Sequence, residues 1–253
     1  MQHLRIFGGV LCASLLLSGG CRSAKPKTDY AGTSIGAVTH SDKAENLDVN
    51  CPVGMVLIPA GPTRFGPVET KDVAASEKDQ AERLVMRAFC IDKYEYPNQP
   101  GEAPMRSVTW MEARDLCTNK GKRLCSEQEF EKACRGPVAT LYTYGDGFAA
   151  GACPASAQEY ASGQYANCVS GFGVADMSGG VYEWTSSSSG EDSVERYLRG
   201  GMSADNASRS ARCTYRVSYR ANVASREVGF RCCTSVQKEE PAKLPKEPSE
   251  KKE

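Results

Sequence analysis

Cysteine is the most abundant residue in this sequence that can both act as a nucleophile and bind a soft metal ion: the chain contains twelve cysteines and only two histidines. A thiolate can hold copper or act as a nucleophile, whereas two oxidised thiols form a disulfide that stabilises the fold. An even number of cysteines in an exported domain predicts up to five disulfides. Apart from Cys12 and Cys21 near the N-terminus, the chain has ten: Cys51, Cys90, Cys117, Cys125, Cys134, Cys153, Cys168, Cys213, Cys232 and Cys233.

A zinc site is the competing use of these cysteines, and their spacing argues against it. No two of them form a CxxC pair, and both histidines, His3 and His40, precede the cysteine-rich region. Without a histidine in that region, Cys-His and Ser-His-Asp nucleophiles are also excluded. Carboxylates near turns are more often caps, turn formers or cation ligands than acid–base groups, so no catalytic residue is assigned among Asp92, Glu95, Asp146, Asp176 and Glu183.

Arginines gather after the RGG at 199–201. They offer an anion-recognising cleft, because guanidinium groups match oxyanions well. The commoner alternative is that they are buried partners for the acidic residues of the domain. Both interpretations stay open for Arg209, Arg212, Arg216 and Arg220.

The N-terminus predicts export. Residues 1–20 combine an early Arg5 with an apolar run and end in small residues, which is typical of a signal peptide and too short for a permanent membrane helix. Small residues before Cys21 resemble the bacterial lipobox, in which that cysteine is lipidated. Arg22 after it points to the outer membrane, facing the periplasm or the cell surface. The alternative is an ordinary cleaved signal peptide with a chance cysteine.

Composition divides the rest into one domain with two appendages. Residues 21–48 predict a flexible tether and residues 234–253 a disordered Lys/Glu/Pro tail, which leaves one domain at 49–233. Acidic and basic side chains balance at 31 each, so no nucleic-acid partner is expected.

Two short helices with capping boxes stand out inside the domain. Thr109 precedes Glu112 by three residues, and Ser126 precedes Glu129 in the same way. The first helix is expected to stop at Gly121 and the second at Gly136. Each places a cysteine on its apolar face, Cys117 and Cys134, so these are expected in disulfides or in the core. Strands are predicted for MVLIPAG (55–61) and LVMRAFCID (84–92), and long loops for 136–225.

A series of motifs in order then resembles the formylglycine-generating enzyme (sulfatase-modifying factor) family across residues 51–233. The resemblance implies an α+β, C-type-lectin-like fold with two short helices, short antiparallel strands and long loops fastened by disulfides. The motifs are MVLIPAGPTRFG, FCIDKYEYPN, PMRSVTWMEARDLCTNKGKRLCSEQEFEKACRG, YTYGD, GFGVADMSGGVYEWTSS, YLRGG and VGFRC.

The resemblance does not extend to the family's reaction. Active members oxidise a substrate cysteine to formylglycine with copper held by two cysteines, five residues apart, shortly after RGG. In this chain those positions fall at Asp205 and Ser210, or the second at Arg212 when counted from the later arginines, and Cys213 is the only nearby thiol. Copper is therefore not expected. Related branches hold iron with three histidines, which this domain lacks.

Two further features are implied by the resemblance alone. One is a calcium ion bound by the carbonyls of Gly179 and Val181 and by Glu183, although Gly180 replaces the family's asparagine. The alternative for this loop is a structural turn. The other is a pair of disulfides, Cys117–Cys232 and Cys134–Cys213, the second partner being displaced by four residues from the family's position.

The sequence as a whole favours an exported, lipid-anchored, non-catalytic binding or structural module, with an unknown protein or glycan partner. The alternative is a formylglycine-generating oxidase, or an oxidoreductase of altered chemistry, that acts on a protein cysteine.

Overall fold

The computed structural model describes residues 50–67, 81–155, 159–201 and 204–236. The expected signal peptide, Cys21, the tether and most of the C-terminal tail lie outside these residues. The expected domain end at 233 falls inside the last strand, which continues to Ser235. None of the helices in the described part of the chain is long and apolar enough to span a bilayer.

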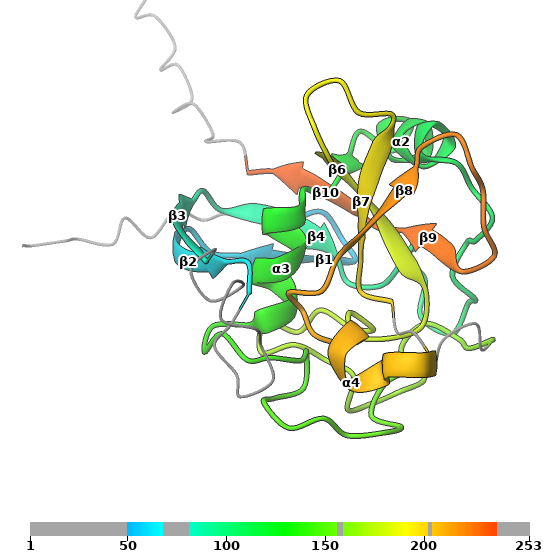
Figure 1. The fold of residues 1–253 in the computed structure, drawn as a ribbon. Coiled ribbons are helices and arrows are strands. Elements are labelled where there is room, and N and C mark those ends of the chain that lie inside the picture. Colours follow the sequence, from blue (N-terminus) through cyan, green and yellow to red (C-terminus); the bar gives the residue numbers. More distant parts are fainter. Residues whose placement is uncertain (1–49, 68–80, 156–158, 202–203, 237–253) are drawn as a thin grey trace, which may run out of the picture. The chain divides into compact units, whose positions relative to one another are not determined.

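The first sheet has four strands, in the order β1-β4-β10-β5, and all of its neighbouring strands are antiparallel. It joins the beginning of the domain to its end, because β4 lies between β1 and β10 (Figure 1). Its strands are β1 (Met55–Ile58), β4 (Phe89–Asp92), β10 (Cys232–Ser235) and β5 (Arg123–Leu124).

The second four-stranded sheet has the order β8-β7-β6-β9, and only β6 and β9 run parallel. Its strands are β6 (Tyr182–Ser188), β7 (Glu195–Arg199), β8 (Val217–Arg220) and β9 (Val228–Phe230). A separate hairpin pairs β2 (Gly61–Phe65) with β3 (Glu82–Met86). The run predicted as one strand at 84–92 is therefore two strands in different sheets, separated by residues 87 and 88.

Both expected helices are present with their capping boxes. In α2 (Trp110–Thr118) and α3 (Glu127–Arg135) the capping hydroxyl and the carboxylate three residues later each accept a backbone N–H. The helix α2 ends at Thr118, slightly before the expected stop at Gly121, and Gly136 caps α3. Two short pieces were not predicted: a 3₁₀ turn at Ala204–Asn206 and α4 (Ala207–Ser210).

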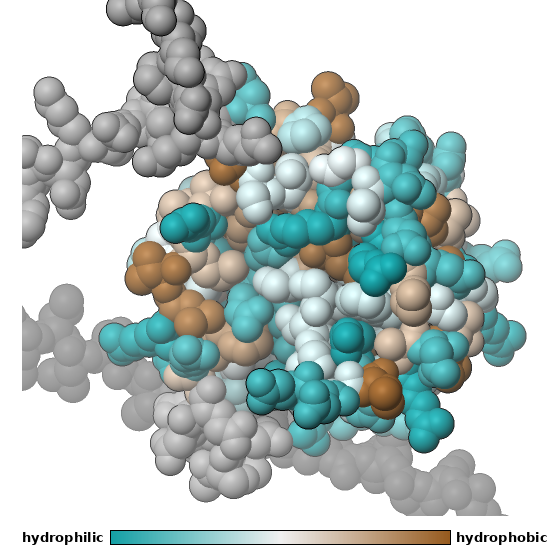
Figure 2. Space-filling view, turned by 90° about the horizontal axis from the view of Figure 1, so that it is seen from above, coloured by the Kyte–Doolittle hydropathy of each residue, from teal (hydrophilic) through white to brown (hydrophobic). Residues whose placement is uncertain are grey.

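Apolar side chains form two clusters, one for each sheet. The first packs the inner side of the β1–β4 sheet against α3, and the second packs α2 against the β6–β7 sheet. On the face shown in Figure 2, apolar residues are separated by polar ones. The first cluster includes Ile58, Phe89, Ile91, Phe130, Val174 and Met177, and the second includes Val108, Trp184, Leu198, Val228 and Phe230.

Five disulfides connect these short elements. Both pairings that the resemblance implied are present, Cys117–Cys232 and Cys134–Cys213. The other three pairings, which the sequence left open, are Cys51–Cys90, Cys125–Cys233 and Cys153–Cys168. Consecutive cysteines at the start of β10 thus bond to the end of α2 and to the residue after β5.

We predict that the two bridges to β10 contribute to stability non-additively. They close nearly the same loop, with sequence separations of 115 and 108 residues, so either bridge alone keeps the unfolded chain constrained. Loop entropy gives a loss of about 3 kcal/mol for removing one bridge and about 7 kcal/mol for removing both. The measurement is guanidinium denaturation of the C117A/C232A variant, the C125A/C233A variant and their combination.

The bridge Cys153–Cys168 is the matched control, because its short loop of 15 residues lies inside the long shared loop and changes the length of that loop only slightly. Its removal should add to the removal of either β10 bridge within about 0.5 kcal/mol. Simple additivity of the two β10 bridges would show that they do not constrain a common loop.

Candidate functional site

A buried ion pair lies where the two sheets meet. Arg231, between β9 and β10, donates from Nε to Glu183 Oε2 and from Nη2 to Glu183 Oε1, both at 2.7 Å. Its Nη1 also donates to the carbonyl oxygens of Asp92 and Lys93, at 3.2 and 3.3 Å. Both charged side chains are 1% exposed. This bidentate geometry satisfies both carboxylate oxygens of Glu183.

Two more carboxylates lie near the same guanidinium. Glu95 accepts a hydrogen bond from the Tyr160 hydroxyl at 2.6 Å, and its other oxygen is 3.9 Å from Arg231 Nη2. Asp176 accepts from Gly163 N at 2.7 Å. Burial raises the pKa of Glu95 to about 8, against the pull of Arg231, and burial also raises the pKa of Asp176 and of Glu183. A single arginine therefore faces three buried acids, and the raised pKa of Glu95 favours its protonated form at neutral pH.

The structure thus brings together four of the five carboxylates noted in the sequence. Asp92 lies next to the cluster, because Arg231 donates a hydrogen bond to the Asp92 backbone carbonyl oxygen. The Asp92 carboxylate itself forms an ion pair with Lys122 at 2.6 Å. The fifth, Asp146, lies elsewhere and accepts from Leu141 N at 2.9 Å, as a turn former does. Only Glu183 in this cluster is fully paired, since Arg231 donates to both of its oxygens, whereas one oxygen of Glu95 and one of Asp176 are buried without a hydrogen-bond partner among the described residues.

The Glu183 carboxylate of the loop expected to bind calcium is paired with Arg231 in this structure. Both oxygens of Glu183 already accept from Arg231, and a Cβ added at Gly180 would overlap the Tyr160 hydroxyl oxygen. That hydroxyl fills the space in which the family's asparagine side chain would begin. Calcium binding by Gly179, Val181 and Glu183 stays a prediction from the resemblance, and it requires the Glu183–Arg231 pair to open.

The segment expected to hold the copper-binding thiols carries none. Asp205 is exposed in the 3₁₀ turn, Ser210 is buried at the end of α4, and Cys213 is bonded to Cys134. Across the described residues, all ten cysteines are in disulfides. No thiol is therefore present there to hold a soft metal ion or to attack a substrate.

Of the four arginines for which both interpretations stayed open, Arg216 is a partner for an acid, as is Arg199 of the preceding RGG. Arg199 of the RGG is 1% exposed and binds Glu127 at 2.9 Å and Glu131 at 3.1 Å. Arg216 reaches Glu127 at 3.3 Å and lies 4.3 Å from the centre of the Tyr197 ring. These two side chains are already engaged, so they do not form an open anion cleft.

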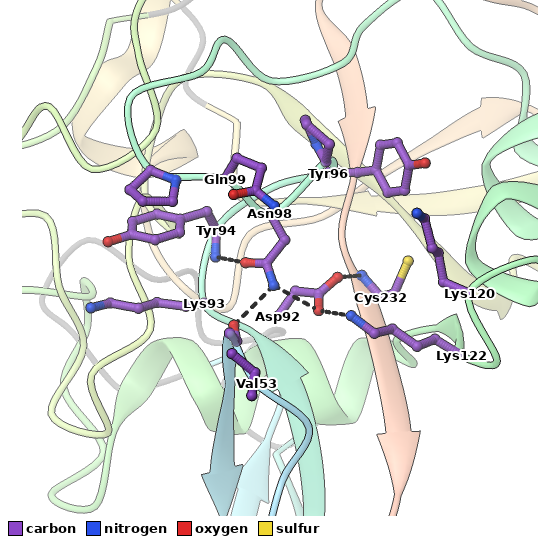
Figure 3. Close-up of a pocket in the computed structure, with 13 residues that line it drawn as sticks. Val53, Asp92, Lys93, Tyr94, Tyr96, Asn98, Gln99, Lys120, Lys122 and Cys232 are labelled. Carbon is purple, nitrogen blue, oxygen red and sulfur yellow. Dashed lines mark hydrogen bonds and ion pairs between the residues drawn. The ribbon is translucent and has the colours of Figure 1, made fainter.

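A cavity of about 490 Å³ lies at the end of β4 (Figure 3). The carboxylate of Asp92 forms part of its wall and accepts from Lys122 Nζ at 2.6 Å, from Asn98 Nδ2 at 3.1 Å and from Cys232 N at 3.1 Å. Sequence reasoning missed this cavity. Its residues come from four separated segments, namely 53–54, 92–100, 120–122 and Cys232, and only the IDKYEYPN and KGKR motifs hinted at it.

We predict that Glu95 makes the domain less stable as the pH rises. Its pKa is raised from an ordinary 4.5 to about 8, so the stabilisation is complete below pH 4.5 and is lost as the pH rises towards 8. Relative to E95Q, the unfolding free energy of the wild type should fall by up to about 1.4 kcal/mol per pH unit in this range. Denaturant unfolding at pH 5, 6, 7 and 8 measures it.

The matched control is E112Q. Hydrogen bonds from Thr109 lower the pKa of Glu112, so this exposed carboxylate is ionised throughout pH 5 to 8. Its replacement should leave the pH dependence as it is in the wild type. Parallel curves for the wild type and E95Q would contradict a proton on Glu95.

Comparison with known proteins places these features in a family. The protein family described as "Sulfatase-modifying factor enzyme 1-like domain" matches residues 96–236 of this chain. Two proteins named inactive C-alpha-formylglycine-generating enzyme 2 are similar in sequence. The one from Bos taurus is 32% identical over 178 residues, covering 60% of this chain and 58% of the relative. The one from Mus musculus is 31% identical over 156 residues, covering 53% and 50%. The chain thus spans between half and three fifths of these relatives.

Solved structures share the fold. PvdO from Pseudomonas aeruginosa has a TM-score of 0.56 at 17% identity, covering 72% of this chain and 94% of PvdO. CarF has a TM-score of 0.54 at 18% identity, covering 74% and 99%. The expected α+β fold is confirmed by these similarities. Since the family description covers more than half of the sequence, the chain belongs to the sulfatase-modifying factor enzyme 1-like family.

Proposed function

We propose that this protein is an exported, lipid-anchored member of the family that acts as a non-catalytic binding or structural module. The observation that carries the proposal is that all ten cysteines in the described residues are oxidised in pairs. The family's reaction needs two thiolates as soft ligands for copper. The name of the two similar mammalian proteins, which are called inactive, supports the same conclusion.

An oxidoreductase of altered chemistry would need a disulfide that a substrate thiol can reach. Thiol–disulfide exchange proceeds by direct attack on a sulfur atom, so access decides the rate. Nine of the ten bonded cysteines are buried, and only Cys51 is partly exposed. This burial favours structural bridges over a redox-active one.

Export is supported by the disulfides, which form in oxidising compartments. Placement in the outer membrane depends on the small residues before Cys21 and on Arg22 after it. A lipid on Cys21 would hold the domain near a membrane through the segment 22–48. In that position a domain without a reactive thiol can present a surface to a protein or glycan partner.

The test of the non-catalytic assignment is a turnover assay. Purified protein with copper, oxygen and a cysteine-containing sulfatase-motif peptide should give no formylglycine above background, because the cysteines of the described residues are all in disulfides and offer no thiol pair to hold the metal. Mass spectrometry of the peptide measures the product, with an active formylglycine-generating enzyme on the same peptide as the positive control. Multiple turnovers by this protein would refute the assignment.

The test of anchoring uses a single substitution. The full chain expressed in a bacterial host should partition into the detergent phase, and C21S should move to the aqueous phase because it cannot be lipidated. Immunoblotting of both phases measures the distribution, and C12S serves as a control that leaves the acceptor intact. Detergent partitioning of C21S equal to that of the wild type would rule out lipidation at this residue.

A further inference from the structure

We infer that the cavity beside Asp92 binds a small ring-containing organic anion, of the sugar-acid class, with Lys120 as its main charged contact. This inference rests on the proposed function, since it gives the binding module a ligand class. It concerns a site built from the residues of β4, of the loop after it and of the turn after α2, and its lining includes no residue of the segment in which the family's thiols would lie.

The size of the cavity suits a small molecule. Its volume of about 490 Å³ falls inside the range of roughly 300–1,000 Å³ that is typical of ligand sites. Macromolecular partners generally need a broader surface of at least about 1,000 Å² in total. The ligand is therefore either free or the end group of a longer chain.

The walls of the cavity are held in place before any ligand arrives. Asn98 accepts from Tyr94 N at 3.0 Å and donates to the Gly54 carbonyl oxygen at 2.9 Å, which ties the two sides together. The ring of Tyr96 stacks on Phe230 with centroids 4.7 Å apart. Gly163 lies against Tyr94, where an added Cβ would be 2.9 Å from the ring. Such preorganisation reduces the entropy lost on binding.

The charge of the cavity favours an anion. Its lining carries three lysines and one carboxylate, and that carboxylate, Asp92, is matched to Lys122. Lys93 lies 5.4 Å from the centre of the Tyr94 ring and forms no ion pair among the described residues. Lys120 is exposed and likewise has no ion-pair partner in the part of the chain that the structure describes. An anionic group in the cavity would meet these charges at lower effective dielectric than in bulk water.

The remaining lining groups specify more than charge. In Figure 3 the Lys120 ammonium lies on the same side of the cavity as Tyr96, while Tyr94 and Lys93 lie on the other side. The Gln99 side chain provides an amide donor and acceptor without a hydrogen-bond partner among the described residues. A sugar acid offers what this set can recognise: a carboxylate for lysine, hydroxyls for the amide and a ring face for tyrosine.

The experiment is an NMR titration of the ¹⁵N-labelled full-chain protein with three probes: D-glucuronate, D-glucose and inorganic phosphate. We expect glucuronate to shift the amides of the cavity residues and to bind more tightly than either other probe. K120Q should weaken glucuronate binding about tenfold, as the loss of a charge-assisted hydrogen bond does. The matched control is R83Q, which removes one positive charge from an exposed position on β3.

Three results would each overturn the inference: equal binding of glucuronate and glucose, phosphate binding as tight as glucuronate, and unchanged glucuronate affinity in K120Q. Phosphate alone would indicate a simple anion site without recognition of a ring. Thermal unfolding of K120Q separates a binding loss from misfolding, and we expect its midpoint to match the wild type. If the protein neither binds glucuronate nor produces formylglycine, the inferred ligand class is wrong and the non-catalytic assignment still holds.

Discussion

The bidentate pair between Arg231 and Glu183 is the interaction on which the arrangement of the two sheets depends. Arg231 lies between β9 of one sheet and β10 of the other, Glu183 belongs to β6, and the same guanidinium holds the carbonyl oxygens at the end of β4. Loss of one partner from such a buried pair costs about 3–5 kcal/mol, because the other charge is left without compensation. Glu95, whose pKa burial raises to about 8, lies beside this internal arginine, and the arginine pairs with the same glutamate that the resemblance implied as a calcium ligand.

Oxidation of the cysteines has two effects on the domain. The disulfides make it rigid, and they leave no free thiol among the described residues to bind a metal ion or to act as a nucleophile. The strands have two to seven residues and the helices at most nine, so their own hydrogen bonds hold little of the chain together. The bridges connect β10 to α2 and to the residue after β5, and α3 to the segment after α4. The bridge from α3 is Cys134–Cys213. Cys213 adjoins the positions of the catalytic cysteine pair in the family, but here it is bonded to Cys134 inside the first apolar cluster.

The sequence by itself determined the features that depend on near neighbours. Thr109 with Glu112 and Ser126 with Glu129 fixed the starts of both helices, because a capping box satisfies backbone donors only three residues away. The ordered motifs also identified the family and, through it, two of the disulfides. The absence of histidine from the domain is a property of composition alone, and it excludes every catalytic mechanism that needs an imidazole.

Tertiary structure decided everything that depends on distant residues. The apolar run at 84–92 gave no sign that β3 and β4 belong to different sheets, since strand periodicity does not specify the partner strand. Three disulfide pairings followed only from proximity in space, because spacing along a chain does not fix connectivity. Likewise, Asp92, Lys120 and Lys122 are ordinary surface types in sequence, and they line one cavity only because β10 brings the turn after α2 beside the end of β4.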